Sequence, residues 1–387
     1  MRLLHTSDWH LGRSFHGTGT LAAQRIFLDN LEKTVRESDV DVVLIAGDVY
    51  DRALPGVDVV ELFDDALERL TAAGAQVIIS SGNHDSATRL GFGGRILERG
   101  GVHLRTRLED LARPVLLPLG PGAELAIYGV PYLEPRIVAT ALDAERPTHA
   151  AVTEAALDLI DADLRRRRRS GTVHSLVMAH TFASGGTSSD SERELALGGL
   201  GAVPLSLFER FDYTALGHLH GQQQLTPTVR YSGSPLPYSF SEARQTKGAW
   251  LVEFSAAGLG GITPVHWPAP KQLAVLEGRL DHLLSDESLV WAEAAYCQVT
   301  LTDPERPPRA MDRLRERFPE TLVLVFAPEG KPAEDTRTYS QRIADAKDDT
   351  GICCGFLEHV RGRQASPEER ALIDTTIDAA LSSAAER

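Results

Sequence analysis

The sequence predicts an α/β protein whose core holds a mixed sheet or two packed sheets. Short apolar runs rich in β-branched residues alternate with helical patterns through the first two-thirds of the chain, which is typical of this class. Further strand-like runs then follow without helices between them. Proline density rises in HWPAPKQ, near residue 268, and indicates a boundary there. Because 387 residues are too many for one compact core, we expect two or three domains.

The individual elements follow from periodicity. Helices are expected over 21–36 and from Val57 to a C-terminal cap at Gly74. Strands are expected in RLLHTS, VDVVLIAGD, AQVIIS, ELAIYGVP, HSLVMAH, YTALGHLH, TVRYSGSP and AWLVEFS. Beyond residue 268, two strands in AYCQVTLTD and TLVLVFAP flank the helical PPRAMDRLRERF and predict a small α/β domain. We therefore divide the chain into 1–268, 269–329 and 330–387.

Composition narrows the class of protein. A net charge of −14 argues against a protein that coats DNA on its own, because phosphate repels it, but not against a carboxylate-rich metal site. Cys297, Cys353 and Cys354 contain no C-x-x-C pair and no disulfide framework, which fits a reducing cytosol. The N-terminus lacks a signal-peptide pattern, and no apolar run reaches the ~18 residues of a membrane helix. We expect a cytoplasmic protein.

Metal-binding residue types stand at the ends of five expected strands. They are Asp8 and His10; Gly47 and Asp48 with Asp51; Asn83, His84 and Asp85; His180; and His218 with His220. Since residues i and i+2 of a strand point to one side, Asp8 and His10 can face one point with Trp9 turned into the core. His218 and His220 can do the same around Leu219.

Carboxylate, imidazole and amide ligands without thiolates suit manganese, iron or zinc. Seven such ligands exceed the need of one ion and suit two ions ~3.5–4 Å apart that clamp a phosphoryl group and activate water. Asp48 is the natural bridging carboxylate. Gly47 before it removes a side chain where metal and backbone approach closely.

The ordered motifs D-x-H, G-D-x-x-D, G-N-H-D, a lone H and G-H-x-H resemble the calcineurin-like metallophosphoesterase superfamily. Within it, LHTSDWHLGRSF, IAGDVYD, SGNHDS, MAHTF, ALGHLHGQQ and YSGSPLPYSFSE resemble the SbcD family of nuclease subunits. This resemblance implies a two-sheet αββα sandwich with a small α/β capping domain over 269–329 and partner-binding helices over 330–387.

The resemblance also implies roles for single residues. Two ions, most simply Mn²⁺, would be shared between two ligand sets: Asp8, His10, Asp48 and His220 for one ion, and Asp48, Asn83, His180 and His218 for the other. His84 would bind no metal, and would instead stabilise or protonate the leaving oxygen. Asp51 matches the residue that orients this histidine. For Asp85 the simplest expectation is a cap on the next helix.

The activity implied is that of a metal-dependent DNA nuclease, an exonuclease on duplex ends and an endonuclease on single-stranded or hairpin DNA. It would act in DNA repair, recombination and replication with an SbcC-like coiled-coil ABC ATPase, as a homodimer within a heterotetramer that involves no membrane. Two alternatives stay open: a phosphoesterase of the same fold acting on a non-DNA phosphate ester, and a scaffold whose site has decayed. The complete ligand set argues against decay.

Three further features allow two interpretations each. The run Arg165–Arg169 is either a solvated helix end or a contact for DNA phosphates. The Gly/Ser-rich FASGGTSSDSERE is either a connector or a lip beside the site. The C-terminal helices either fold back on their own domain or bind the ATPase.

The last helix opens with a capping-box pattern at Ser366, Pro367 and Glu369. Its expected apolar face comprises Leu372, Ile373, Thr376, Ile377, Ala380 and Leu381. A shorter helix before it offers Phe356, Leu357 and Val360 and ends at Gly362.

Overall fold

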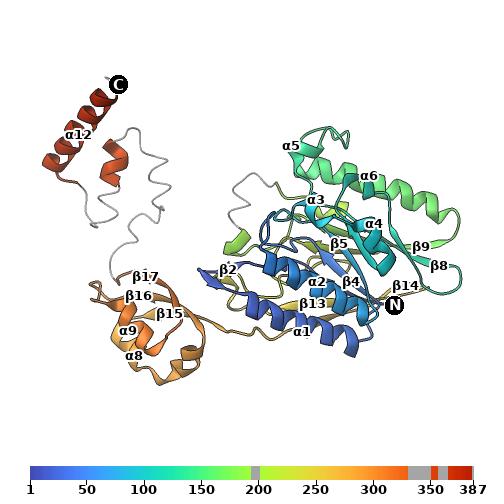
Figure 1. Cartoon of the computed structure of the whole chain (residues 1–387), viewed down its shortest axis with the longest axis horizontal. Coiled ribbons are helices and arrows are strands. Elements are labelled where there is room, and N and C mark those ends of the chain that lie inside the picture. Colours follow the sequence, from blue (N-terminus) through green and yellow to red (C-terminus); the bar gives the residue numbers. More distant parts are fainter. Residues whose placement is uncertain (193–200, 330–349, 356–364, 386–387) are drawn as a thin grey trace. The chain divides into compact units, whose positions relative to one another are not determined.

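Two six-stranded sheets carry most of the chain in this computed structural model, which describes residues 1–192, 201–329, 350–355 and 365–385 (Figure 1). The first sheet has the order β14-β13-β1-β4-β5-β6, with bounds Gly258–His266, Gly248–Ser255, Arg2–Thr6, Val42–Ala46, Gln76–Ser80 and Val102–Arg105. The second has the order β11-β12-β10-β9-β8-β7, with bounds Gln223–Gln224, Val229–Tyr231, Tyr213–Gly217, Thr172–His180, Ala123–Gly129 and Val115–Pro118.

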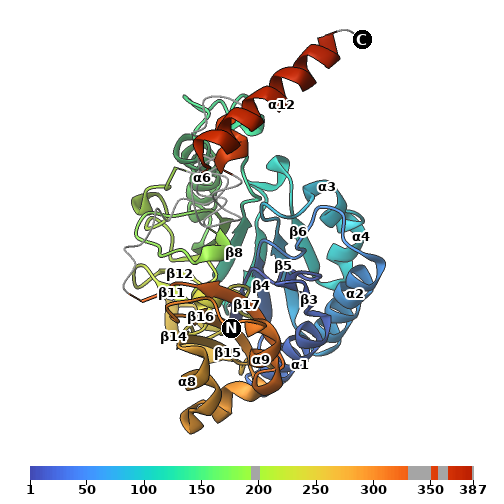
Figure 2. The ribbon, with the colours of Figure 1, turned by 90° about the vertical axis from the view of Figure 1, so that its left-hand side faces the viewer.

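Helices cover both outer faces of the paired sheets. In Figure 2, α1 (Leu21–Glu37) and α2 (Val57–Ala72) lie outside β4 and β5, and α6 (His149–Arg168) lies beyond β8. The helices α1 and α2, the two sheets and α6 make four layers, and an apolar core lies between each neighbouring pair. One core lies under α1 and α2, one lies between the sheets, and one lies under α6. The two-sheet sandwich with outer helices is therefore confirmed. Short elements complete this part of the chain: β2 (Ser14–Phe15), β3 (Thr18–Gly19), α3 (Ala87–Leu90), α4 (Gly94–Leu97) and α5 (Pro135–Val138).

Parallel pairing directs the important loops to one edge of the sandwich. β1, β4 and β5 run parallel in the first sheet, as do β8, β9, β10 and β12 in the second. In parallel sheets the carboxyl ends of the strands meet at one edge, where ligands commonly bind. Across the two sheets, His180 at the end of β9 lies 2.9 Å (Nδ1) from the carbonyl oxygen of Ala46 at the end of β4. The loops that follow these strands therefore converge.

Four strands that the periodicity did not predict, β6, β7, β11 and β14, lie at sheet edges. β14 has the sequence GLGGITPVH, and its glycines and proline weaken the strand pattern. Glycine and proline are tolerated in a strand at an edge, where one side of the ladder needs no partner.

After residue 268 the chain forms a three-stranded sheet of order β15-β16-β17 (Leu273–Gly278, Tyr296–Leu301 and Thr321–Phe326), with α8 (Leu280–Ser285) and α9 (Ala310–Arg317). β15 adds one strand to the two expected. Among the described residues, those within 1–300 and 308–325 form one compact unit, and those within 301–307 and 326–387 form another.

The last helix, α12 (Pro367–Ala385), has the expected capping box. The Ser366 hydroxyl oxygen accepts the Glu369 amide at 3.2 Å, and the Glu369 carboxylate accepts the Ser366 amide at 2.8 Å. Ile373 and Ile377 are half-buried, whereas Leu372 is 69% exposed. The expectations for Phe356, Leu357, Val360 and Gly362, and for the side chains of Ala380 and Leu381, fall outside the described residues. In the described parts of the chain, no helix combines the length and apolar character needed to span a membrane.

Candidate metal centre

The seven candidate ligands meet where the two sheets present their strand ends. Asp8 and His10 follow β1, Asp48 follows β4, and Asn83 follows β5. His180 is the last residue of β9, and His218 and His220 follow β10. All are buried except Asn83, which is half-buried. Each sheet thus contributes one part of a single polar cluster.

The local backbone differs from the alternating strand that the sequence suggested. Asp8, His10, Asp48 and His218 have φ values of 53°, 44°, 51° and 108°, in loops beyond the strand ends. Trp9 and Leu219 are nonetheless fully buried, as expected. The paired residues therefore face one point because of tight left-handed turns and not because of strand alternation. Such conformations cost a non-glycine residue about 1–2 kcal/mol and persist at functional sites.

Two groups of donor atoms can be distinguished. In the first, donor atoms of Asp8, His10 and His220 all lie within 4.8 Å of one another, and the Nε2 atoms of the two histidines are 3.2 Å apart. In the second, Asn83 Oδ1 lies 3.0 Å from His180 Nε2 and 3.3 Å from His218 Nδ1. The structure thus brings all seven predicted ligands together.

Asp48 lies between the two groups. Its Oδ2 atom is 3.3 Å from His180 Nε2 and 3.6 Å from His10 Nε2. Asp8, Asp48 and His180 also form a group within 4.8 Å, which links the two sets of donors. A carboxylate in this position has one oxygen within reach of both sets.

The chemistry of these residues fits divalent cations. Among the described residues of this cluster, four buried carboxylates, those of Asp8, Asp48, Glu192 and Glu242, are accompanied by the single buried ammonium of Lys247. Buried charge needs compensation, and metal ions supply it. His10 Nδ1 is buried without a hydrogen-bond partner in the described chain, and the nearest carboxylate oxygen to it is that of Asp51 at 3.7 Å.

The pKa values of the histidines in the cluster also favour the binding of a cation. Burial lowers the pKa of His10 well below its usual range and that of His218 to about 3, so both imidazoles are neutral, the form that binds metal. Burial also opposes charge on His180, but the carboxylates of Asp48 and Asp8 outweigh it and raise that pKa to about 9. Asp48 therefore attracts positive charge to the position of the second group.

His84 lies beside these donors and is held from two sides. Its amide donates to Asp48 Oδ1 at 2.9 Å, and its ring Nδ1 lies 2.9 Å from the main-chain carbonyl oxygen of Asp51. A carbonyl can only accept, so Nδ1 carries the hydrogen and Nε2 is left for another partner. The His84 ring thus hydrogen-bonds to the main chain of Asp51 and not to its side chain. The Asp51 carboxylate lies 3.8 Å from Arg13 Nε. His84, His10 and Asp48 also form a donor group within 4.8 Å.

Asp85 does not cap the next helix, and that expectation was wrong. Ser86 is the N-cap of α3. The Asp85 carboxylate instead accepts the amides of Val49, Tyr50 and Gly82 at 3.2, 2.9 and 2.9 Å. It thereby joins the loop that carries Asp48 to the loop that carries Asn83.

Glycines allow these loops to approach one another. Gly47 has φ 86°, and a Cβ there would lie 2.4 Å from His180 Nδ1, as expected of a residue beside a crowded site. A Cβ on Gly82 would lie 2.1 Å from Asp48 Oδ1. Both positions therefore exclude a side chain.

Several supporting residues were not predicted from the sequence. His5, fully buried between the sheets, lies 3.0 Å (Nδ1) from Tyr213 Oη and 3.1 Å (Nε2) from the Leu216 carbonyl oxygen. Ser7 donates to the Asp8 carboxylate. Glu242 and Lys247 form a buried ion pair behind His220. Charged residues are usually exposed, so no composition signal marked this pair.

The arginine run and the Gly/Ser-rich segment, each of which allowed two interpretations, both contact other residues in the structure. In the arginine run, Arg165 pairs with Asp161, Arg166 and Arg167 with Asp163, and Arg168 with Asp212, at the end of α6. The Gly/Ser-rich segment turns inward near its end, where Ser189 and Glu192 are buried.

Comparisons with known proteins agree with the site. The calcineurin-like phosphoesterase family model matches residues 1–222, and the model described as type 5 capsule protein repressor C-terminal domain matches 269–351. SbcD of Staphylococcus saprophyticus, a subunit of the nuclease SbcCD, is 30% identical over 98% of this chain and 99% of its own length. Its counterpart in Staphylococcus epidermidis is 28% identical over 95% of both chains.

A dimetal phosphatase from Danio rerio, 14% identical over 69% of this chain and 99% of its own, gives a TM-score of 0.42, too low to carry a conclusion. The family match covers more than half of this chain, and the similarity to the Staphylococcus saprophyticus protein covers nearly all of it. The chain therefore belongs to the calcineurin-like phosphoesterases and, within them, to the SbcD family of nuclease subunits.

Proposed function

We propose that this chain cleaves DNA phosphodiester bonds at a two-metal centre, as the nuclease subunit of an SbcCD-type complex. The observation that carries the proposal is the position of Asp48, whose Oδ2 atom lies 3.3 Å from His180 Nε2 and 3.6 Å from His10 Nε2. One carboxylate between two donor groups is the arrangement that a pair of ions requires.

Asp8, His10, Asp48 and His220 would hold one divalent ion, and Asp48, Asn83, His180 and His218 the other. The donor set suits Mn²⁺. When bound, such a pair supplies positive charge to the phosphoryl oxygens and lowers the pKa of water to generate a nucleophile.

His84 would act on the leaving oxygen. Because the Asp51 carbonyl engages Nδ1 at 2.9 Å, Nε2 is the atom that can hold and transfer a proton. Its amide is tied to Asp48 Oδ1 at 2.9 Å, which keeps the ring beside the bridging carboxylate. Proton transfer of this kind contributes about 10²–10⁴-fold to a rate.

The relatives' names also suggest an assembly. We infer that the chain works in the cytoplasm as a homodimer with an SbcC-like coiled-coil ABC ATPase, and that residues 330–387 provide the contact. Residues 1–268 would form the catalytic domain and 269–329 the capping domain. Within the complex the activity would be exonucleolytic on duplex ends and endonucleolytic on single-stranded or hairpin DNA, in repair, recombination and replication.

A direct assay separates this proposal from its alternative, a phosphoesterase for a non-DNA ester. The full chain is incubated with Mn²⁺ and labelled linear duplex or hairpin DNA, with and without the SbcC-like ATPase, and in parallel with p-nitrophenyl phosphate. We expect DNA cleavage that the ATPase increases and that Asp48→Asn abolishes. Hydrolysis of the monoester with intact DNA under every condition would favour the alternative.

A further inference from the structure

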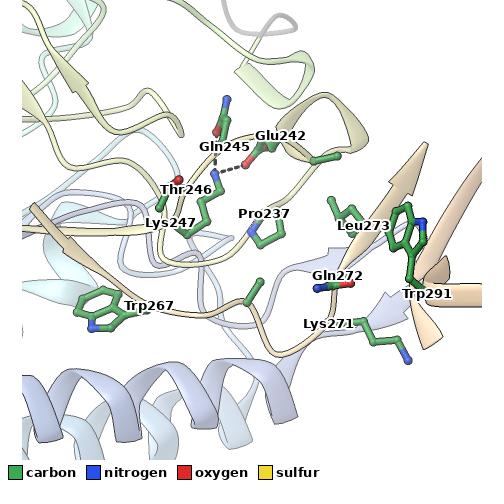
Figure 3. A pocket seen from close by; sticks show the side chains of 12 residues that line it. Pro237, Glu242, Gln245, Thr246, Lys247, Trp267, Lys271, Gln272, Leu273 and Trp291 are labelled. Atoms are coloured by element: carbon green, nitrogen blue, oxygen red, sulfur yellow. Dashed lines mark hydrogen bonds and ion pairs between the residues drawn. The ribbon is translucent and has the colours of Figure 1, made fainter. Parts of the chain in front are cut away.

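A buried ionic network lies directly behind His220. Glu242 and Lys247 are 1% and 4% exposed, and Lys247 Nζ donates to Glu242 Oε2 at 2.5 Å. Figure 3 shows Lys247 directed toward Glu242 and Gln245 at the wall of a pocket that Trp267 also lines. Burying ionised groups costs free energy unless their partners are held in place. Glu242, Lys247 and their hydrogen-bond partners therefore form a defined structural unit.

The network fixes which nitrogen of His220 carries the hydrogen. Ser191 Oγ donates to Glu242 Oε1 at 2.8 Å and lies 2.9 Å from His220 Nδ1. A hydroxyl has one hydrogen, and the carboxylate takes it, so the serine oxygen accepts from Nδ1, which also lies 3.4 Å from Glu242 Oε1. In the neutral imidazole Nε2 is then the unprotonated nitrogen, and it is the atom 3.2 Å from His10 Nε2 in the first donor group.

The same network also holds the main chain of His220. Lys247 Nζ donates to the His220 carbonyl oxygen at 2.8 Å, in addition to its bond with Glu242. The Glu192 carboxylate accepts the amide of His220. The ring, the carbonyl and the amide of one candidate ligand are thus all held by buried or half-buried side chains outside the set of seven candidate ligands.

The second donor group is supported differently. His180 Nδ1 lies 2.9 Å from the main-chain carbonyl of Ala46, and the His218 amide donates to Asp8 Oδ1 at 3.0 Å. None of these contacts involves Glu242 or Lys247. A change in the ionic network should therefore affect the two groups unequally.

We propose that Glu242 and Lys247 are positioning residues for His220, and that they support the ion held with Asp8 and His10 but not the ion held with Asn83, His180 and His218. The inference rests on the proposed two-metal function. Glu242 acts through Ser191 and the imidazole, and Lys247 acts by holding Glu242 and the His220 main chain in place. Partners of this kind behind a metal ligand typically change metal affinity by about 10–100-fold.

The test is a comparison of Mn²⁺ binding by the full-length wild type, Glu242→Gln, Lys247→Met and the double variant. Calorimetric titration counts the ions, and electron paramagnetic resonance distinguishes a coupled pair from an isolated ion. Asp163→Asn is the matched control, because Asp163 is also a buried carboxylate, with partners Tyr128, Arg166 and Arg167 that lie outside the site. Melting temperatures in chelator report stability apart from metal binding.

We expect Glu242→Gln to bind one ion as the wild type does and the other about 10–100-fold more weakly, with the spectrum of an isolated ion at limiting Mn²⁺. Lys247→Met should weaken the same ion, and its effect should be smaller in the Glu242→Gln background, because Lys247 acts partly through Glu242 and partly on the His220 carbonyl oxygen. Asp163→Asn should bind both ions normally.

Unchanged binding of both ions by Glu242→Gln overturns the inference. Equal weakening of both ions, together with a melting temperature below that of Asp163→Asn, would show a merely structural role and also overturn it. If Glu242→Gln does not fold, Ser191→Ala decides, since it removes the nearer partner of Nδ1 at 2.9 Å and leaves both charges in place, with Glu242 Oε1 still 3.4 Å from Nδ1. It should weaken the same ion, and unchanged binding of both ions overturns the inference. If the wild type binds a single ion, the two-metal proposal is refuted. The inference about Glu242 then stands if Glu242→Gln weakens the binding of that ion, and fails if it does not.

Discussion

Replacing Gly82 by alanine should disable the metal centre from outside the ligand set. A Cβ there would lie 2.1 Å from Asp48 Oδ1 and 2.4 Å from Asp48 N. Ordinary contact begins at 3.4 Å, so the carboxylate would have to retreat by about 1.3 Å. The glycine cannot easily move instead, because its amide is bonded to Asp85 at 2.9 Å.

The expected magnitude follows from that displacement. A misplacement of about 1 Å in a catalytic group costs on the order of 10²-fold in rate. Overpacking should also lower the free energy of unfolding by about 1–3 kcal/mol. We therefore expect Gly82→Ala to remain folded in calorimetry, to lose tight Mn²⁺ binding in titration, and to cleave DNA at least about 100-fold more slowly.

Gly171→Ala is the control, because a Cβ at Gly171 meets nothing within 4 Å. It should match the wild type in metal binding and activity. If Gly82→Ala bound Mn²⁺ as tightly as Gly171→Ala, the crowding at Asp48 would not control the site, and the reasoning would fail.

Four further outcomes are expected. His84→Ala should keep both ions in titration yet lose about 10²–10⁴-fold in rate, whereas Asp48→Asn should lose both metal and activity; loss of metal in His84→Ala would refute the division of roles. The isolated chain should be a dimer in light scattering. Its affinity for DNA in filter-binding assays should be low and should fall as salt rises, because its net charge is −14. Truncation after Glu329 should leave a folded, metal-binding chain that no longer co-purifies with the ATPase, and retention of the ATPase would contradict this. Burial lowers the pKa of His5 from 6.5 to about 3, so the unfolded chain takes up a proton that the folded chain refuses as pH falls below 6.5. Between pH 6.5 and pH 5, the free energy of unfolding of the wild type should therefore fall by about 2 kcal/mol more than that of His5→Gln, as measured in metal-free urea titrations.

The interior of the fold could be predicted from the sequence, whereas its edges could not. β4 and β5 are nearly continuous apolar runs, because strands covered on both faces need apolar residues throughout. β14 lies at an edge and carries glycines and a proline, so the same pattern was absent.

The candidate site shows a similar division. The order of the motifs was sufficient to name seven candidate donors that the structure brings together, since the sequence carries their residue types and spacing. The backbone at Asp8 and His218 is left-handed, and strand alternation could not anticipate it. Glu242 and Lys247 were missed for another reason: their burial depends on a contact with His220 that only the tertiary structure creates.

The division of the donors between two sheets has a consequence for the growing chain on a ribosome. Asp8, His10, Asp48 and Asn83 emerge early, but His220 follows Asn83 only after a further stretch that includes the whole of α6 and β9. β1 can pair early with β4, but its other neighbour, β13, comes much later and pairs with it through Trp250, Leu251, Val252 and Glu253. The complete set of candidate donors therefore exists only after residue 220 has been synthesised. An ion that binds only the folded sandwich would stabilise it by about 2.7 kcal/mol at 100 times the dissociation constant, and a chain released before residue 220 would lack His220, one candidate ligand of the first donor group.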